Sequence, residues 1–322
     1  MCCFQRPDPI STENPYIGNL LDDSFDAIWF GDEAETIRRQ TAEGILAKKC
    51  QVPGCPYLAN RKPQKIHYGE YPNFLEIDLP NTHCNVGGAE PSRENPACIM
   101  CERAGGPGIF KPEIDRLAEV IPRLRNIVSS LSQIHIQGIA EPFYKDIIFQ
   151  VLDWIGYDAH KDQITISTTT NGTLLKPAVR KHYLTRCPRS ITNFSIDAAT
   201  PETFKRIRIF DCFDRVLENL YAFNRERIRP RQFLRVTNNL NILNIHEAVA
   251  MVKIAADADA EYVEFNPTDG FNTSILVNEQ NCGVFRRVQD DIIAECKRLN
   301  VPLNLIRPLD LGMTDRLVQI TL

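Results

Sequence analysis

Segments with the pattern of strands and of helices alternate along the chain from residue 74 to residue 299. The strand-like segments are short and apolar, and we expect strands at Phe74–Leu79, Gln133–Gln137, Gln163–Thr168, Ile191–Ile196, Phe233–Thr237 and Glu261–Asn266. Because strands that are separated by helices pair in parallel, six such repeats predict a parallel sheet with helices on its outer face. The sequence therefore predicts an α/β fold, a partial (β/α)6 barrel of the TIM type.

Apolar side chains recur with helical spacing between these strands. One helix is expected with an apolar stripe from Ile147 to Ile155, a second from Phe204 to Phe223, and a third from Ile245 to Ala256. A last helix is expected at Phe285–Leu299, and Val301–Ile306 could add a strand after it.

Two sequence signals predict where helices begin. Thr200 followed by Pro201 has the pattern of an N-cap and a first helical residue. Asn244, with Glu247 three residues later, resembles a capping box for the third helix.

Three cysteines lie in the loop that follows the first predicted strand. Thirteen residues separate Cys84 from Cys98, and two separate Cys98 from Cys101. A Cys-x2-Cys pair places two thiolates on one turn, and a third thiolate from the same loop can join them at one metal centre. Three thiolates leave a coordination position open, as a catalytic iron–sulfur centre requires. A zinc site completed by His83, or cysteines that never meet, fits the spacing equally well.

Composition limits the classes of function. The chain has 322 residues, enough for one large α/β domain with a small appendage, and its net charge of −4 gives no sign of nucleic-acid binding. No apolar run is long enough to span a membrane, and the N-terminus lacks the apolar core of a signal peptide. Eleven cysteines without such a signal favour the reducing cytoplasm and metal ligation over disulfides.

The N-terminal segment differs in character from the rest, and we place a domain boundary between residues 65 and 66. Residues 1–65 contain Cys2, Cys3, Cys50 and Cys55, together with a helix expected at Ala34–Ala47. So short a segment buries little core by itself, so a metal would supply stability. Residues 66–322 form the predicted barrel.

Polar motifs follow the predicted strands in a fixed order. They are QGIAEP from Gln137, TTTNGT from Thr168, NFSID from Asn193 and FKRIR from Phe204. Together with the three cysteines, this ordered set resembles the radical S-adenosylmethionine (SAM) superfamily over about residues 70 to 270. The resemblance is to the branch that carries SPASM-type accessory cluster domains. In β/α barrels function gathers at the carboxyl ends of the strands, where all these motifs fall.

The resemblance implies an enzyme and its cofactors. In this family a 4Fe–4S cluster, here held by Cys84, Cys98 and Cys101, binds SAM at its open iron. One electron from the cluster cleaves SAM to methionine and a 5′-deoxyadenosyl radical, which abstracts hydrogen from a substrate. We expect a peptide or small-metabolite substrate, with peptide modification as the leading case. A reductase or a flavodoxin- or ferredoxin-type protein would donate the electron.

The resemblance also assigns residues to the methionine part of SAM. The turn at Gly138, Ala140 and Glu141 would hold the amino group, and Ser195 and Arg208 would hold the carboxylate, Arg208 by a charge-assisted bond. Ala140 departs from the family pattern, which has a second glycine there.

Four further residues are assigned to the nucleoside part of SAM. Asn171, Asp197 and Asn239 are candidates for the ribose hydroxyls, and Met100 lies where the family usually has an aromatic side chain against adenine. Each of these motifs alone also fits an ordinary turn or cap; Asp197, for example, could simply cap the helix that begins near Thr200.

The cysteine spacing is the main departure, because the family usually has Cys-x3-Cys-x2-Cys. The extra residues between Cys84 and Cys98 cost only about 1–2 kcal/mol of loop entropy, which is small beside thiolate–iron bonding. The N-terminal segment from Gly18 to Pro56 resembles half of a SPASM domain, but precedes the barrel instead of following it. Cys2, Cys3, Cys50 and Cys55 could hold an auxiliary iron–sulfur cluster, zinc or no metal.

Two other functions are compatible with parts of the sequence. A barrel of this kind could be a non-catalytic metal- or cluster-binding module that serves a partner protein. A polar SAM-dependent methyltransferase is disfavoured, because no strand is followed by the glycine-rich turn that opens such folds.

Overall fold

A computed structural model describes residues 17–45, 70–79, 98–100, 114–138, 140–268, 273–276, 282–305 and 319–320. In this part of the chain one eight-stranded sheet has its strands in sequential order, and β1 to β7 pair in parallel while β8 runs antiparallel to β7. The strands are β1 (Phe74–Leu79), β2 (Gln133–Gly138), β3 (Thr165–Thr170), β4 (Ser190–Ser195), β5 (Gln232–Leu240), β6 (Tyr262–Pro267), β7 (Leu303–Leu305) and β8 (Gln319–Ile320).

The sheet confirms the predicted fold class, an open and partial β/α barrel. All six predicted strands are present. β3 lies two residues later than expected, because the backbone N–H groups of Gln163 and Ile164 bond to His160 and end the preceding turn. β5 runs on to Leu240, and β8 was not expected from the sequence.

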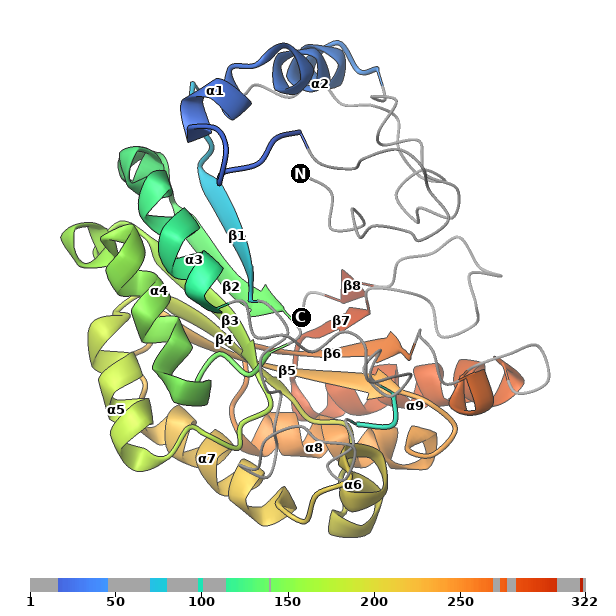
Figure 1. The fold of residues 1–322 in the computed structure, drawn as a ribbon. Coiled ribbons are helices and arrows are strands. Elements are labelled where there is room, and N and C mark those ends of the chain that lie inside the picture. The colour runs from blue at the N-terminus through green and yellow to red at the C-terminus, as the bar shows by residue number, and fades with distance from the viewer. Residues whose placement is uncertain are drawn as a thin grey trace.

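Helices cover one face of this sheet, as Figure 1 shows for α4 to α8. The α-helices are α1 (Phe25–Trp29), α2 (Asp32–Ala42), α3 (Ile114–Val120), α4 (Ile147–Ile155), α5 (Pro177–Arg186), α6 (Pro201–Arg208), α7 (Phe213–Glu226), α8 (Ala248–Asp257) and α9 (Cys282–Leu299). The 3-10 helices are η3 (Ile121–Ser130), η4 (Tyr144–Asp146), η5 (Tyr157–His160), η6 (Ile245–Glu247) and η7 (Thr273–Ile275).

The helix predicted from Phe204 to Phe223 is two helices, and the single-helix prediction was wrong. α6 ends because Ile209 adopts a left-handed conformation with φ of 70°, and α7 begins after Cys212. The predicted start of α6 is confirmed, since the Thr200 hydroxyl accepts a hydrogen bond from the Thr203 backbone N–H at 3.3 Å.

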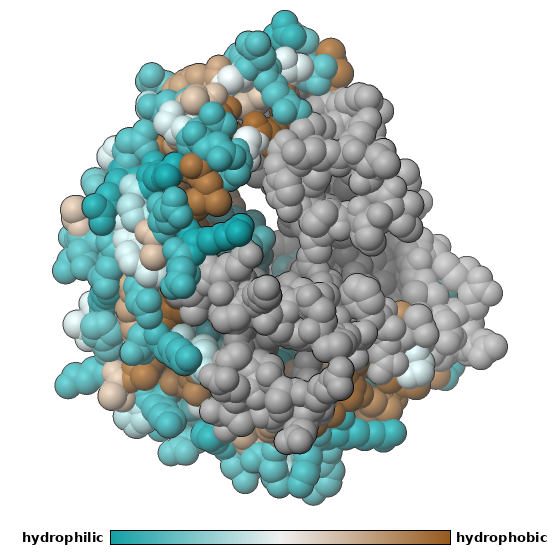
Figure 2. Space-filling model, in the orientation of Figure 1, coloured by the Kyte–Doolittle hydropathy of each residue, from teal (hydrophilic) through white to brown (hydrophobic). Residues whose placement is uncertain are grey.

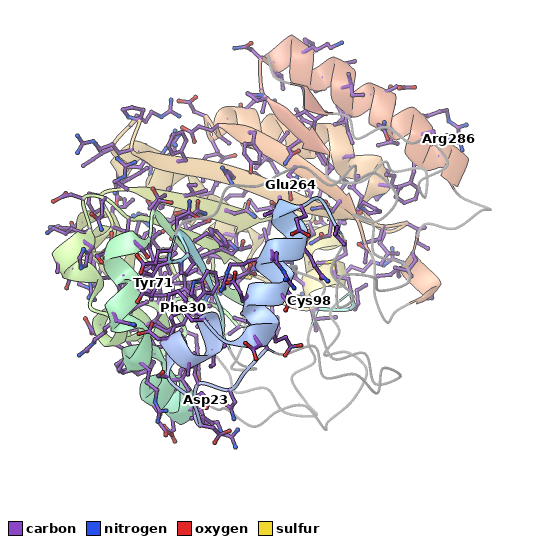
Figure 3. All side chains as sticks on the ribbon, turned by 90° about the horizontal axis from the view of Figure 1, so that it is seen from above. Asp23, Phe30, Tyr71, Cys98, Glu264 and Arg286 are labelled. Atoms are coloured by element: carbon purple, nitrogen blue, oxygen red, sulfur yellow. The ribbon has the colours of Figure 1, made fainter. Side chains whose placement is uncertain are left out.

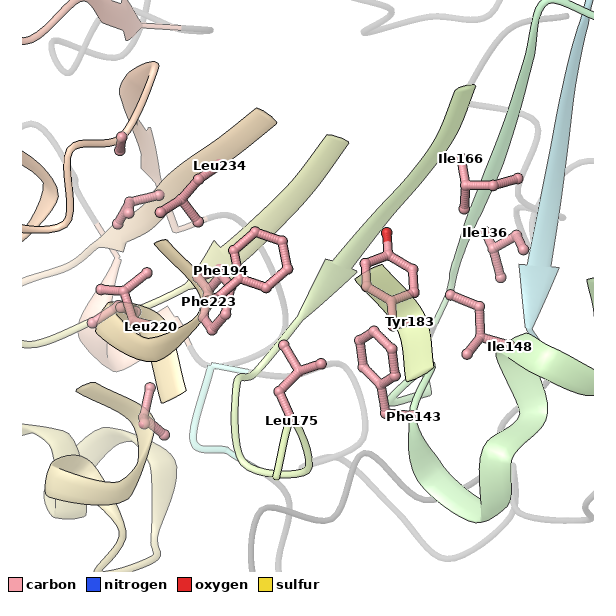
Figure 4. Close-up of a cluster of buried hydrophobic side chains, with 14 of the residues drawn as sticks. Ile136, Phe143, Ile148, Ile166, Leu175, Tyr183, Phe194, Leu220, Phe223 and Leu234 are labelled. Atoms are coloured by element: carbon pink, nitrogen blue, oxygen red, sulfur yellow. The ribbon is translucent and has the colours of Figure 1, made fainter. Parts of the chain in front are cut away.

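The core lies between the sheet and its helices. Figure 4 shows its two parts: Ile136 and Ile166 of the sheet lie near Ile148 of α4, and Phe194 of β4 meets Phe223 of α7. The Phe194 and Phe223 rings are 5.6 Å apart in an edge-to-face arrangement, and both side chains are fully buried. Burial of this apolar surface drives the helices onto one face.

The N-terminal segment around α1 contacts the barrel near β1. Arg123 of η3 donates hydrogen bonds to the carbonyl oxygens of Leu20 and Leu21 at 2.7 and 3.0 Å. Phe30 meets Tyr71, just before β1, with ring centroids 5.5 Å apart (Figure 3). α2 ends before Ala47, contrary to prediction, because Gly44 takes a left-handed conformation.

The surface over the helices is mainly hydrophilic in the face drawn in Figure 2, with scattered apolar side chains. Within the described ranges, no helix is both long and apolar enough to cross a membrane.

Candidate active site at the carboxyl ends of the strands

The predicted site residues that the structure describes gather at one edge of the sheet. Gly138 ends β2, Asn171 follows β3, Ser195 ends β4 and Asn239 lies near the end of β5. Since β2 to β5 are parallel neighbours, these carboxyl ends lie side by side. For the described residues, this topology confirms the prediction that the motifs converge on one rim.

Gly138 is at a position that only glycine fits. Its φ is +130°, and a Cβ atom built there would lie 2.5 Å from the carbonyl oxygen of Leu79 in β1 and 2.6 Å from the Leu79 nitrogen. Neither backbone atom can give way without disturbing the β1–β2 pairing. The small residue was expected to let the backbone approach SAM closely. In the structure, the close approach at Gly138 is to the backbone of Leu79 in β1.

Glu141 is buried, with 1% of its surface exposed, and its carboxylate reaches the end of β3. One oxygen accepts a hydrogen bond from the Thr170 hydroxyl at 2.6 Å, and the other accepts one from the Asn171 backbone N–H at 2.8 Å. Burial raises the pKa of Glu141 to about 7, although these bonds, a bond from the Phe143 backbone and the charge of Arg208 oppose the shift. This carboxylate ties the ends of β2 and β3 together.

The side-chain amide of Asn171 has its oxygen held by the protein, whereas its nitrogen has no partner among the described residues. Its Oδ1 accepts hydrogen bonds from the backbone N–H and the hydroxyl of Thr173, at 2.9 and 2.6 Å. Because a backbone N–H only donates, this contact fixes which end of the amide is the oxygen. The Nδ2 group is buried and has no acceptor among the described residues. Buried donors are normally paired, so this one is suited to a ligand oxygen.

Arg208, at the end of α6, lies at the centre of the site. Its Nη2 contacts the Ser195 hydroxyl at 2.8 Å and the Ser195 carbonyl at 3.0 Å, and it forms an ion pair with Asp197. Arg208 is 5% exposed and Asp197 is fully buried. The other Asp197 oxygen accepts a hydrogen bond from the Asn239 backbone N–H at 2.8 Å. Asp197 therefore orients Arg208 and joins the ends of β4 and β5.

Cys98, the described cysteine of the loop after β1, lies beside Arg208. Its Sγ lies 3.9 Å from Nη1 of Arg208, and the thiol is buried. The next residue, Ile99, donates its backbone N–H to the Ile207 carbonyl of α6 at 3.0 Å. A guanidinium group beside a thiol favours the thiolate, the form that binds metals.

A second layer of polar residues supports α6 and the strand ends. Glu247, from η6, accepts hydrogen bonds from the Ala199 and Thr200 backbone and from the hydroxyls of Thr200 and Thr203, at 2.5–3.2 Å. Asn244 donates to the carbonyls of Asp197 and Asn239 at 2.8 and 2.9 Å.

The capping box predicted for Asn244 and Glu247 is therefore wrong. The Asn244 amide donates to carbonyls after β4 and near the end of β5, and the Glu247 carboxylate accepts hydrogen bonds at the start of α6. These buried groups need partners there, so neither side chain caps η6. Sequence reasoning missed this supporting role, and it also missed Thr170. The only signal for Thr170 was its place in the threonine run before Asn171.

The remaining predicted residues divide into two groups. Ala140 is buried in the core, and Met100 packs partly buried against it. The other cysteines assigned to metal sites lie outside the described residues: Cys2, Cys3, Cys50, Cys55, Cys84 and Cys101.

Known proteins resemble this chain in sequence and in fold. No family model matches it. Probable GTP 3′,8-cyclases from Saccharolobus solfataricus and from Saccharolobus islandicus are 27% identical to it over 170 and 168 residues, which is 46% of this chain and 51% of each relative. The chain thus spans about half the length of the curated relatives it matches.

Solved structures share the fold at low sequence identity. Streptococcus suis SuiB bound to S-adenosylmethionine superposes with a TM-score of 0.53 at 15% identity, over 73% of this chain and 50% of SuiB. The complex of SuiB with the precursor peptide SuiA gives 0.52 at 14% identity, over 73% of this chain and 48% of SuiB. The protein anSMEcpe with bound AdoMet gives 0.51 at 15% identity, over 71% of this chain and 63% of that protein.

These relatives and structural neighbours are radical SAM enzymes. The open parallel sheet, the order of the motifs at its carboxyl edge and the sequence match agree with that family. The chain therefore shares its fold with these enzymes, and it resembles the curated relatives in sequence over 46% of its length.

Proposed function

We propose that the chain is an enzyme that cleaves SAM reductively at a 4Fe–4S cluster. The observation that carries the proposal is the position of Arg208. This buried cation lies between the Cys98 sulfur and the carboxyl ends of β4 and β5, where Ser195 and Asp197 hold it. A site that brings an anionic amino-acid group next to a thiolate-bound metal needs a cation in this place.

The residues fit the cofactors on two counts. Asn171 offers a buried amide donor without an acceptor among the described residues, and Cys98 offers a buried thiol beside a guanidinium. We assign Cys84, Cys98 and Cys101 to the cluster. When bound, the cluster supplies one electron to SAM, and cleavage yields methionine and a 5′-deoxyadenosyl radical.

We assign the protein's contacts with SAM as follows. Arg208 and Ser195 hold the methionine carboxylate, and the Gly138–Glu141 turn holds the amino group. Asn171 and Asn239 remain candidates for the ribose hydroxyls. Asp197 was predicted there too, but it is fully buried and its two oxygens are held by Arg208 and by the Asn239 backbone, so we assign it instead to orienting Arg208. Met100 remains the candidate against adenine.

The substrate we propose is a peptide or a small metabolite, with a peptide favoured. Support comes from the structural neighbours, since SuiB was solved with the precursor peptide SuiA and anSMEcpe with the Kp18Cys peptide. The curated relatives, named for a reaction of GTP, support a small molecule. A flavodoxin- or ferredoxin-type protein, or a reductase, is the electron donor we expect, in the cytoplasm.

Anaerobic reconstitution with iron, sulfide and zinc in competition tests the proposal. We expect about four irons and four sulfides in the barrel cluster, with the broad visible absorbance of thiolate–iron bonds. Stoichiometric zinc with no uptake of iron would contradict the proposal and support the non-catalytic binding module.

We predict that Arg208→Ala and Glu141→Gln weaken SAM binding while the iron content stays unchanged. Loss of a hydrogen bond to a charged group costs about 1.5–3 kcal/mol, so the Kd for SAM should rise about ten- to a hundredfold. Equilibrium binding to the reconstituted protein measures this. Arg206→Ala and Glu202→Gln, which change exposed residues of the same helix α6, are matched controls. Wild-type SAM affinity in both site variants would overturn the assignment.

We also propose that residues 1–65 are a partial SPASM-like segment with its own auxiliary iron–sulfur cluster. Cys50, Cys55 and at least one of Cys2 and Cys3 would bind it. Support comes from the sequence resemblance, and Leu20 and Phe30 of this segment contact the barrel near β1.

We predict about eight irons per wild-type chain and about four in the Cys50→Ala/Cys55→Ala variant. Iron and sulfide counting after complete reconstitution measures this. About four irons in both proteins would leave the barrel cluster alone and remove the auxiliary one.

A further inference from the structure

The two faces of β5 and β6 differ in chemistry. Leu234, Val236, Val263 and Phe265 are fully or almost fully buried on the helix-covered face. The residues that alternate with them face the other way. That inner face carries polar and aromatic side chains, most of them partly exposed: Arg235, Thr237 and Asn239 of β5, and Tyr262, Glu264 and Asn266 of β6.

Arg235 is a cation held in a fixed place on this inner face. Its guanidinium carbon lies 4.4 Å from the centre of the Tyr262 ring, which is its direct partner across the β5–β6 pairing. Stacking on an aromatic ring orients a guanidinium group without neutralising its charge. No carboxylate of a described residue lies within 4.0 Å of it, and its buried Nε has no hydrogen-bond acceptor among those residues.

Glu264 of β6 is influenced by the charge of Arg235 but forms no ion pair with it in the described part of the chain. It accepts hydrogen bonds from the side-chain amides of Asn266 at 3.0 Å and of Asn304 at 3.1 Å. Burial raises the pKa of Glu264, and the charge of Arg235 only partly opposes that rise. Two uncharged amides thus satisfy the carboxylate (labelled in Figure 3), while the guanidinium keeps its charge for another partner.

Arg235 is also well placed relative to the proposed SAM site. It lies four residues before Asn239 on the same strand and the same face, so its Cα is about 13 Å from the rim, at roughly 3.3 Å per residue. This span fits one small molecule or about three to four residues of an extended peptide between the rim and the Cα atom of Arg235. A partner held there would reach from Arg235 to the place where SAM is cleaved.

We propose that Arg235, stacked on Tyr262, anchors an anionic group of the substrate inside the barrel. The group is a carboxylate or a phosphate, both of which match the guanidinium fork. This inference rests on the proposed function, because it assigns the substrate of the same site. It predicts that the substrate carries an anion within about 13 Å of the atom that loses hydrogen.

Calorimetric titration of the reconstituted protein with saturating SAM tests the inference. Inorganic pyrophosphate probes phosphate binding, and N-acetylglycine, compared with N-acetylglycinamide, probes carboxylate binding. We expect at least one anion to bind, with an affinity about ten- to a hundredfold lower in Arg235→Gln. Arg235→Lys keeps the charge and should retain part of the affinity. Arg231→Gln, an exposed arginine before β5, should bind like the wild type.

The outcomes separate this inference from the proposed function. Release of 5′-deoxyadenosine without substrate, measured in the same preparations, should be equal in the wild type and Arg235→Gln. Anion binding that depends on Arg235 supports the anchor even if SAM is not cleaved. Binding of neither anion to the wild type, or equal binding to Arg235→Gln, overturns the anchor even if SAM is cleaved normally.

Discussion

Replacement of Cys84, Cys98 and Cys101 by Ala together is expected to abolish SAM cleavage. The variant should lose the visible absorbance of the barrel cluster, because no other cysteine in the proposed site can replace three thiolates. Cys98→Ala alone should have nearly the same effect on cleavage, since Cys98 is the thiol that the structure places beside Arg208. Absorbance, iron content and product release measure these losses.

Cys296→Ala is the matched control for these variants. Cys296 is fully buried in α9, and burial raises the pKa of its thiol to about 12, so it is a protonated core residue and not a ligand. The control should lose some stability but keep iron and cleavage at wild-type levels. Full iron content and full cleavage in the triple variant would show that the barrel cluster has been assigned to the wrong residues.

Gly138→Ala is expected to destabilise the fold as well as the site. The new methyl group would meet the Leu79 backbone at 2.5 Å, at a φ of +130° that alanine rarely adopts. Strain and overpacking of this kind each cost about 1–3 kcal/mol, so the sum is roughly 2–6 kcal/mol. Thermal unfolding of the reconstituted protein should show a Tm lower by about 3–9 °C.

Gly283→Ala is the control for this substitution. Gly283 lies in α9, and a Cβ atom built there has no neighbour within 4 Å. Alanine favours a helix over glycine by about 1 kcal/mol, so the Tm should stay the same or rise. If Gly138→Ala unfolds at the wild-type temperature, the close β1–β2 approach described here is not present in solution.

The fold could be predicted from the sequence because its signals are local. Alternating apolar strands and amphipathic helices give the order of elements, and the β/α order gives a parallel sheet. The split between α6 and α7 could not be predicted in this way, since apolar spacing continues across it. It depends on Ile209, an isoleucine in a left-handed conformation that the sequence does not favour.

The candidate site could be predicted in part, because its residues follow strands that end at one edge. Ser195, Asp197 and Arg208 are brought together as expected. The contacts of Glu247 with α6 and of Arg235 with Tyr262 could not be predicted, because they join segments far apart in the sequence. Glu247 lies 44 residues from Thr203, and only the fold brings them together.

The central claim is that this chain holds a cluster that cleaves SAM, and release of 5′-deoxyadenosine tests it most directly. The reconstituted wild-type protein is incubated anaerobically with SAM and a strong reductant, and the products are quantified. We predict 5′-deoxyadenosine and methionine in equal amounts, with neither formed by the triple cysteine variant. A fully loaded cluster that binds SAM but releases no 5′-deoxyadenosine would contradict the account.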